Sequence, residues 1–215
     1  MEFGVVGVKN DSLLLYDNET RSQWSQLGGE AIDGAHQGKR LEVVPSRLTT
    51  WSQWKSLHPD TTVYVRRRFP YRSRFTAQEI AKFANQNGEG VGASDLVIVL
   101  KTKNGTGLAY PLTVLARKTL MNEDLGEFPI LLFYPGTPTR VQVGSRMMGD
   151  RILRFKLTED GDVQDLETGS TWNLETMTAV SGELTGKRLK MVPFMFSRWS
   201  AWEHYRPDTR LVTGE

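Results

Sequence analysis

Two pairs of carboxylates occur in the same pattern, D-x-E-T-x-S-x-W. Asp17 and Glu19 form the first pair, and Asp165 and Glu167 form the second. Neighbouring carboxylates can act as general acid and general base, or can bind calcium. The spacing fits no calcium-binding loop, and Asp followed by Thr, Gly or Ser is also typical of hydrogen-bonded turns. We therefore keep the four acids as candidate catalytic residues, with turn formation as the alternative.

A second group of candidates is a basic and aromatic run that contains no acid, between positions 66 and 75. Arginines in such a run could bind phosphates or an anionic polymer, with aromatic rings stacking beside them. The alternative is a solvated linker between two structured units. The candidate binding residues are Arg66, Arg67, Arg68, Tyr71, Arg72 and Arg74.

The sequence excludes thiol chemistry and contains no motif for a metal site or a phosphate-binding loop. The chain has no cysteine, which excludes disulfides, thiolate catalysis and cysteine-based metal sites in it. Its three histidines lack metal-ligand spacing, and the glycine-rich NGEGVG follows an expected helix and precedes an expected strand, the reverse of the order in phosphate-binding loops. We expect no cofactor and no bound metal.

Bulk composition is that of an ordinary globular protein. The chain has 215 residues, of which 39% are hydrophobic and 24% charged, with a net charge of +2. That charge is too small to indicate nucleic acid or a membrane surface as a partner. The first residues do not resemble an export signal, and no apolar run approaches the roughly 20 residues that span a bilayer.

The elements that would position these residues are repeated. Residues 17–61 match the sequence 148 positions later without a gap, so that GKRLEVVP returns as GKRLKMVP and TTWSQWKSLHPDT faces SRWSAWEHYRPDT. Each copy predicts short strands separated by turns, followed by a helix of about two turns. Thr49 or Thr50 is placed to cap the first helix, and His58-Pro59 ends it.

Each of these short helices carries two tryptophans spaced i and i+3, which lie on one helix face: Trp51 with Trp54, and Trp199 with Trp202. Such a face could stack sugars or bases. Our interpretation is that the tryptophans instead fasten each helix to its sheet, because a two-turn helix needs tertiary packing to form.

The repeat predicts the domain organisation. We expect a first repeat unit over residues 1–65, a basic connector with a helix over 66–95, and a complete second unit over 96–215. The expected fold is a β-rich α+β structure of two related units with pseudo-twofold symmetry. Because the first unit lacks a counterpart of residues 107–145, its sheet is expected to have a free edge through which the chain could self-associate.

Several of these motifs together resemble the domain-of-unknown-function family numbered 3179. They include FGVVGVKNDSLLLYDNETRSQWSQ, LAYPL, DLETGSTWNLETMTAVSGELTGKRL and WSAWEHYRPDT. The resemblance implies a bacterial or archaeal protein, often exported, with no established activity. Family members usually carry a Cys-Pro-Leu-Cys segment, and the corresponding place in the second unit is Tyr134-Pro135-Gly136-Thr137, so no thiol chemistry carries over.

The expected function is a non-catalytic binding or structural module with an unknown ligand. One alternative is an enzyme acting on a polar or anionic substrate at the cleft between the two units. Another is a nucleic-acid or polyanion binder that uses the Arg66–Arg74 run. A cleft where acids and arginines converge would favour the enzyme, and a continuous basic aromatic face would favour the polyanion binder.

Overall fold

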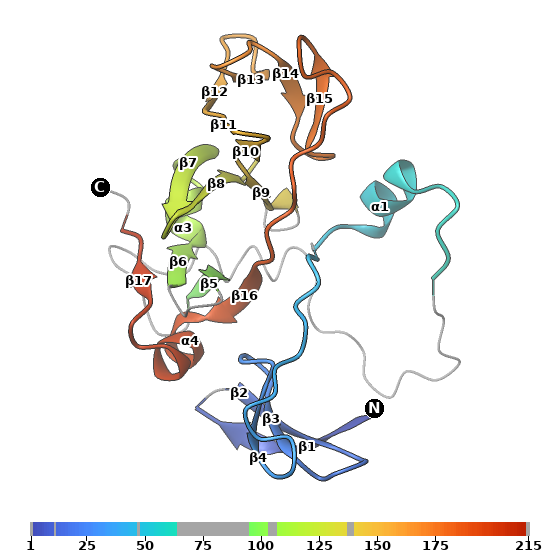
Figure 1. Cartoon of the computed structure of the whole chain (residues 1–215), viewed down its shortest axis with the longest axis vertical. Coiled ribbons are helices and arrows are strands. Elements are labelled where there is room, and N and C mark those ends of the chain that lie inside the picture. Colours follow the sequence, from blue (N-terminus) through green and yellow to red (C-terminus); the bar gives the residue numbers. More distant parts are fainter. Residues whose placement is uncertain are drawn as a thin grey trace.

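The computed structural model describes residues 2–10, 12–46, 48–63, 95–102, 107–136 and 140–213. In these ranges the chain forms several small, mostly antiparallel sheets and a few short helices (Figure 1). This confirms the prediction of a β-rich fold with small antiparallel sheets. The predicted connector, residues 66–95, lies outside the described residues except for Asp95.

Two four-stranded sheets have the same strand order and closely similar registers. The first contains β1 (Phe3–Lys9), β2 (Ser12–Asp17), β3 (Gln23–Ser25) and β4 (Glu30–Asp33). The second contains β12 (Phe155–Leu157), β13 (Val163–Asp165), β14 (Thr171–Asn173) and β15 (Thr178–Ser181). Trp24 pairs with Ala31 in the first sheet as Trp172 pairs with Ala179 in the second, next to the same register shift. The repeat in the sequence is therefore also a repeat in structure over these strands.

A central sheet lies between these two in the order β16-β5-β6-β17 (Figure 1). Its strands are β5 (Leu96–Lys101), β6 (Gly107–Pro111), β16 (Met195–Arg198) and β17 (Arg210–Leu211), of which β17 runs parallel to β6. The run LVIVLK in β5 is apolar on both faces because both faces are covered. Val97 and Val99 face one hydrophobic cluster, and Ile98 and Leu100 face another.

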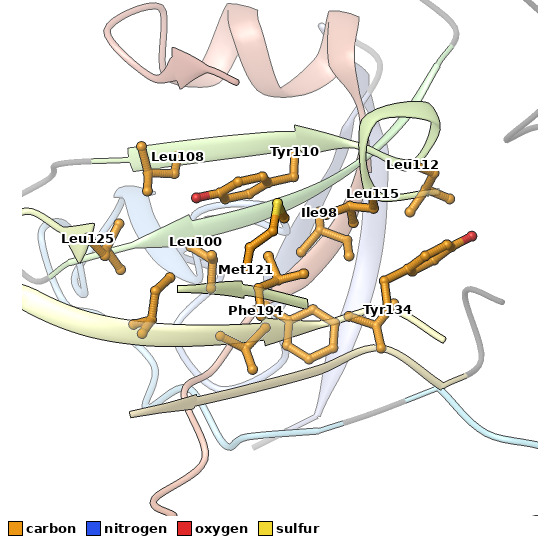
Figure 2. Close-up of a cluster of buried hydrophobic side chains, with 14 residues drawn as sticks. Ile98, Leu100, Leu108, Tyr110, Leu112, Leu115, Met121, Leu125, Tyr134 and Phe194 are labelled. Carbon is orange, nitrogen blue, oxygen red and sulfur yellow. The ribbon is translucent and has the colours of Figure 1, made fainter. Parts of the chain in front are cut away.

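The larger cluster joins the central sheet to a three-stranded sheet. That sheet consists of β7 (Leu120–Leu125), β8 (Phe128–Phe133) and β9 (Gln142–Ser145), and the short helix α3 (Leu112–Leu115) precedes it. Figure 2 shows Tyr110, Met121 and Phe194 between the strands of the two sheets. A two-stranded ribbon of β10 (Met147–Met148) and β11 (Arg151–Ile152) then leads to β12.

A buried arginine holds this middle region together. Arg146 donates to the carbonyl oxygens of Ile130, Leu153 and Glu123 over 3.0–3.2 Å, and to Asp124 Oδ1 over 2.8 Å. Its guanidinium therefore satisfies backbone acceptors from three segments at once, for which the planar, five-donor group is well suited.

The two tryptophan-bearing helices have different surroundings. In α4 (Trp199–Tyr205) both tryptophans are buried against Val97, Val99 and Ala109, which confirms the packing role predicted for the second copy. In α1 (Trp51–Leu57) the predicted Thr50 cap and the end at His58 are present, but no residue is buried. Figure 1 shows α1 away from the sheets. The prediction that Trp51 and Trp54 fasten this helix to a sheet is therefore wrong within the described part of the chain.

Candidate functional site

The carboxylate of Asp17 is enclosed by hydrogen-bond donors in the first sheet. Trp24 Nε1 donates to Asp17 Oδ2 over 2.9 Å, and the backbone N–H and hydroxyl of Thr20 also donate to this carboxylate. Burial raises the pKa of Asp17, but the bonds from Trp24 and Thr20 and the proximity of His36 outweigh it and leave the pKa well below its ordinary value. The group is held as a buried anion.

The second sheet repeats this network. Trp172 Nε1 donates to Asp165 Oδ2 over 2.8 Å, and Thr168 donates to the same carboxylate through its backbone and its hydroxyl. Ser170 Oγ accepts from the backbone N–H of Leu184 over 3.0 Å, as Ser22 Oγ accepts from His36 in the first sheet. The pattern D-x-x-T-x-S-x-W thus encodes one hydrogen-bonded unit that joins a turn to a buried indole.

The two glutamates of the candidate pairs lie at the surface of their turns. Glu167 accepts from the backbone N–H and from Nε of Arg154 over 2.7 and 2.8 Å. Burial raises the pKa of Glu167, but these bonds and the charge of Arg154 lower it below its usual value. Glu19 is exposed beside Asp17. Each acid pair is thus part of the turn of its own sheet.

A pocket of about 190 Å³ lies between the first sheet and α4. The β1–β2 hairpin and strands β3 and β4 form one wall, and one face of α4 forms the other. None of the four candidate acids lines it, and the predicted arginine run lies outside the described residues. The lining residues are Lys9, Asn10, Ser12, Leu13, Leu14, Ser25, Leu27, Ile32, Ala201, His204 and Tyr205.

Two of the residues that line this pocket, Ser12 and Tyr205, carry buried hydroxyl oxygens that have no hydrogen-bond partner in the described residues. His204 also lines the pocket, and its Nδ1 lies 2.7 Å from the Ser200 carbonyl oxygen. Because a carbonyl only accepts, Nδ1 donates, and in the neutral ring Nε2 remains an acceptor. The pocket therefore combines donors and an acceptor with an apolar wall, which is typical of small-molecule sites.

Several cationic side chains lie next to the pocket, at the junction between the first sheet and α4. Lys101 Nζ donates to the Gly28 carbonyl oxygen over 3.2 Å, and Arg206 stacks over the Tyr205 ring at 5.2 Å. Burial lowers the pKa of Lys101, and the positive charges of Arg206 and Arg40 lower it further. Glu30 faces this group through an ion pair of 3.1 Å with Arg40. The junction carries a local excess of positive charge.

Sequence reasoning missed the pocket because its residues come from both copies of the repeat. Ser12 and Lys9 belong to the first sheet, whereas His204 and Tyr205 belong to α4, and no sequence motif joins them. Within the described ranges, no group of three or more His, Asp or Glu side chains could hold a metal ion. None of the described helices is long and apolar enough to cross a membrane.

Comparison with known proteins gives a family and no activity. No curated protein and no solved structure matches the chain. A family model described as "Protein of unknown function (DUF3179)" matches it twice, over residues 1–163 and 77–215. The two matches overlap and together span the whole sequence, which agrees with the resemblance noted in its motifs. The chain therefore belongs to the DUF3179 family.

Proposed function

We propose that the chain is a non-catalytic binding module that takes a small polar or anionic ligand in the pocket between the first sheet and α4. The observation that carries this proposal is the pair of buried hydroxyls, on Ser12 and Tyr205, for which the described residues offer no hydrogen-bond partner. A buried polar group without a hydrogen bond costs about 1–3 kcal/mol. A ligand whose polar atoms reach these two oxygens would recover that cost.

The size and charge of the pocket indicate the kind of ligand. Its volume of about 190 Å³ is below the range of roughly 300–1,000 Å³ for drug-sized ligands and corresponds to about six waters. Lys9 lines it, and Lys101 and Arg206 lie at the same junction. A compact anion, or a sugar-sized molecule with several hydroxyls, fits these properties.

The acids support a binding module over an enzyme at the same cleft. Asp17 and Asp165 are fully buried, and the same set of donors occupies the carboxylate in each sheet. An acid or base in catalysis must reach the substrate directly or through one water. The duplication of the network favours a structural role, because both copies use it for the same turn.

We further propose that the two four-stranded sheets and the two tryptophan-bearing helices belong to two copies of one unit with pseudo-twofold symmetry. The equal strand orders, the Asp–Trp bonds and the repeated Trp-to-Thr bonds of the helices support it. In those bonds, Trp54 Nε1 donates to Thr61 over 3.0 Å and Trp202 Nε1 donates to Thr209 over 2.8 Å. The pocket would then lie where one unit meets the helix of the other.

The binding proposal is tested by nuclear magnetic resonance titration of the labelled chain with inorganic phosphate, acetate and glucose. We expect at least one of them to shift the amide signals of Ser12 and Tyr205 in a saturable manner. Tyr205→Phe and Ser12→Ala should each weaken that binding about tenfold, since each removes one hydrogen bond in a buried site. Thr158→Ala, on the corresponding hairpin of the second sheet, is the matched control. Equal binding by Tyr205→Phe and the wild type would count against the proposal.

A further inference from the structure

The two copies of the repeat bury their internal cores equally. Trp24 and Trp172 are both buried, as are Ala31 and Ala179, and the Asp–Trp bond is present in each sheet. At several paired positions the copies differ in burial, and there the residue of the second copy lies against the region from β5 to β9, residues 96–145. This makes the second copy a direct guide to what the first copy lacks.

Three positions show the difference. Phe3 is 40% exposed whereas its counterpart Phe155 is 4% exposed, and Leu41 is 44% exposed whereas Leu189 is 1% exposed. Trp51 is 50% exposed and Trp199 is 9% exposed. These counterparts follow from the Phe3–Asp17 and Phe155–Asp165 pairings and from the shared GKRL and W-S-x-W motifs.

The structure also shows what covers the second copy. Trp199 packs with Val97 and Val99 of β5. The backbone of Phe155 both donates to and accepts from the Asn122 side chain of β7 over 2.8 Å. Leu189 lies in one cluster with Leu131 of β8. Every one of these partners belongs to the β5–β9 region.

The first copy is shaped for the same contact. Helix α1 is formed and capped by a reciprocal pair of bonds between Thr50 and Gln53, and Trp54 is fixed by its bond to Thr61. A seven-residue helix with no buried residue is otherwise marginal in water. The exposed apolar side chains along this segment are Leu41, Val43, Val44, Leu48, Trp51 and Val63.

We infer that residues 41–46 and 48–63, together with Phe3, form a docking surface for a second β-region of the β5–β9 type, supplied by another polypeptide segment. Such a partner offers an apolar strand resembling LVIVLK, with valines toward α1. A second copy of this chain does not fit as the partner. In the described residues each chain has one β5–β9 region, and its own β16 and β17 already occupy both edges of the β5–β6 pair. This inference does not depend on the pocket.

The test is a fusion in which a copy of residues 95–153 replaces Met1, directly before Glu2. This position reproduces the order of the second copy, in which residues 95–153 come directly before Arg154. Glu2 is the counterpart of Arg154, because the Glu2 carbonyl oxygen accepts from the Asn18 N–H as the Arg154 carbonyl oxygen accepts from the Leu166 N–H. Hydrogen exchange with mass spectrometry should show exchange in α1 slowed at least tenfold relative to the unmodified chain. The matched control carries Val97→Asp and Val99→Asp in the added copy only, and α1 should then exchange at its original rate.

Rapid exchange in α1 beside a protected added region would overturn the inference. Should the fusion not fold, a labelled peptide of residues 48–63 decides the question. The peptide should bind the Trp202→Ala variant of the full chain at least tenfold more tightly than it binds the wild-type chain. The reason is that Trp202→Ala weakens the packing of α4 on β5, which is the surface that the peptide would take. The inference would be overturned if the peptide did not bind. It would also be overturned if a peptide with Trp51→Ala and Trp54→Ala bound equally tightly. A dimer of the unmodified chain, detected by light scattering and abolished by Trp51→Ser, would also overturn it by making a second copy the partner.

Discussion

Replacing Trp202 by alanine tests how α4 is held. The side chain is fully buried against Val99 and Ala109, and its Nε1 donates to Thr209 over 2.8 Å. Truncating a buried tryptophan costs about 3–5 kcal/mol, which includes the cavity left behind. For a chain of this length each kcal/mol lowers the melting temperature by about 2–4 °C, so Trp202→Ala should lower it by roughly 6–20 °C.

The matched variant is Trp54→Ala in the first copy. Trp54 makes the corresponding bond to Thr61, but α1 has no buried residue. We expect its loss to cost no more than about 1–2 kcal/mol, the value of one hydrogen bond and partial packing. Urea unfolding, followed by circular dichroism so that tryptophan loss does not affect the signal, compares the two. Equal destabilisation would show that α1 is packed as tightly as α4 and would refute this account.

The remaining predictions concern the buried polar groups and the junction. Asp165→Asn should lower the free energy of unfolding by about 1–3 kcal/mol, because the new amide places a donor against the buried indole N–H; an unchanged urea midpoint would contradict this. The lowered pKa of Asp17 predicts stability that is complete above the unfolded value of about 3.9 and is lost as the pH falls through the folded pKa. The stability gap between the wild type and Asp17→Asn should therefore narrow from pH 7 to pH 3, and a constant gap would oppose it. Gly28→Ala should destabilise the junction by about 1–3 kcal/mol, because its Cβ would lie 2.5 Å from Tyr205 Oη; adding Tyr205→Ala should recover part of that loss in a double-mutant cycle. Arg146→Met should cost at least about 3 kcal/mol in thermal unfolding, because three carbonyl oxygens lose their donor at about 1–3 kcal/mol each; an unaltered transition would contradict the network.

Local pattern predicted much of the architecture. The D-x-E-T-x-S-x-W motif marked a turn followed by a strand, and Thr50 and His58 mark the start and end of α1 as expected. These features depend on hydrogen bonds between residues a few positions apart, so the sequence contains them directly. The β-rich class followed from the same short-range signals.

Long-range packing could not be predicted in the same way. The similarity of TTWSQWKSLHPDT to SRWSAWEHYRPDT, with both tryptophans shared, indicated equal burial for Trp51 and Trp199, yet only the second helix packs on β5 in the described residues. The burial of a helix residue depends on which other segments pack against that face of the helix. The sequence of the helix itself does not specify those segments. The pocket was missed for the same reason, since Ser12 and Tyr205 meet only when the first sheet contacts α4.

The pocket residues also occupy positions where the two copies differ. The first hairpin is four residues longer than its counterpart, since Phe3 pairs with Asp17 whereas Phe155 pairs with Asp165, and Lys9 and Ser12 lie in this longer hairpin. In α4, His204 and Tyr205 stand where α1 has Ser56 and Leu57. Residues that build the shared fold are the same in both copies. A ligand site that is formed only once must instead use positions at which the two copies differ. The distribution of differences therefore supports the proposed ligand site between the first sheet and α4 over a site at the duplicated acids.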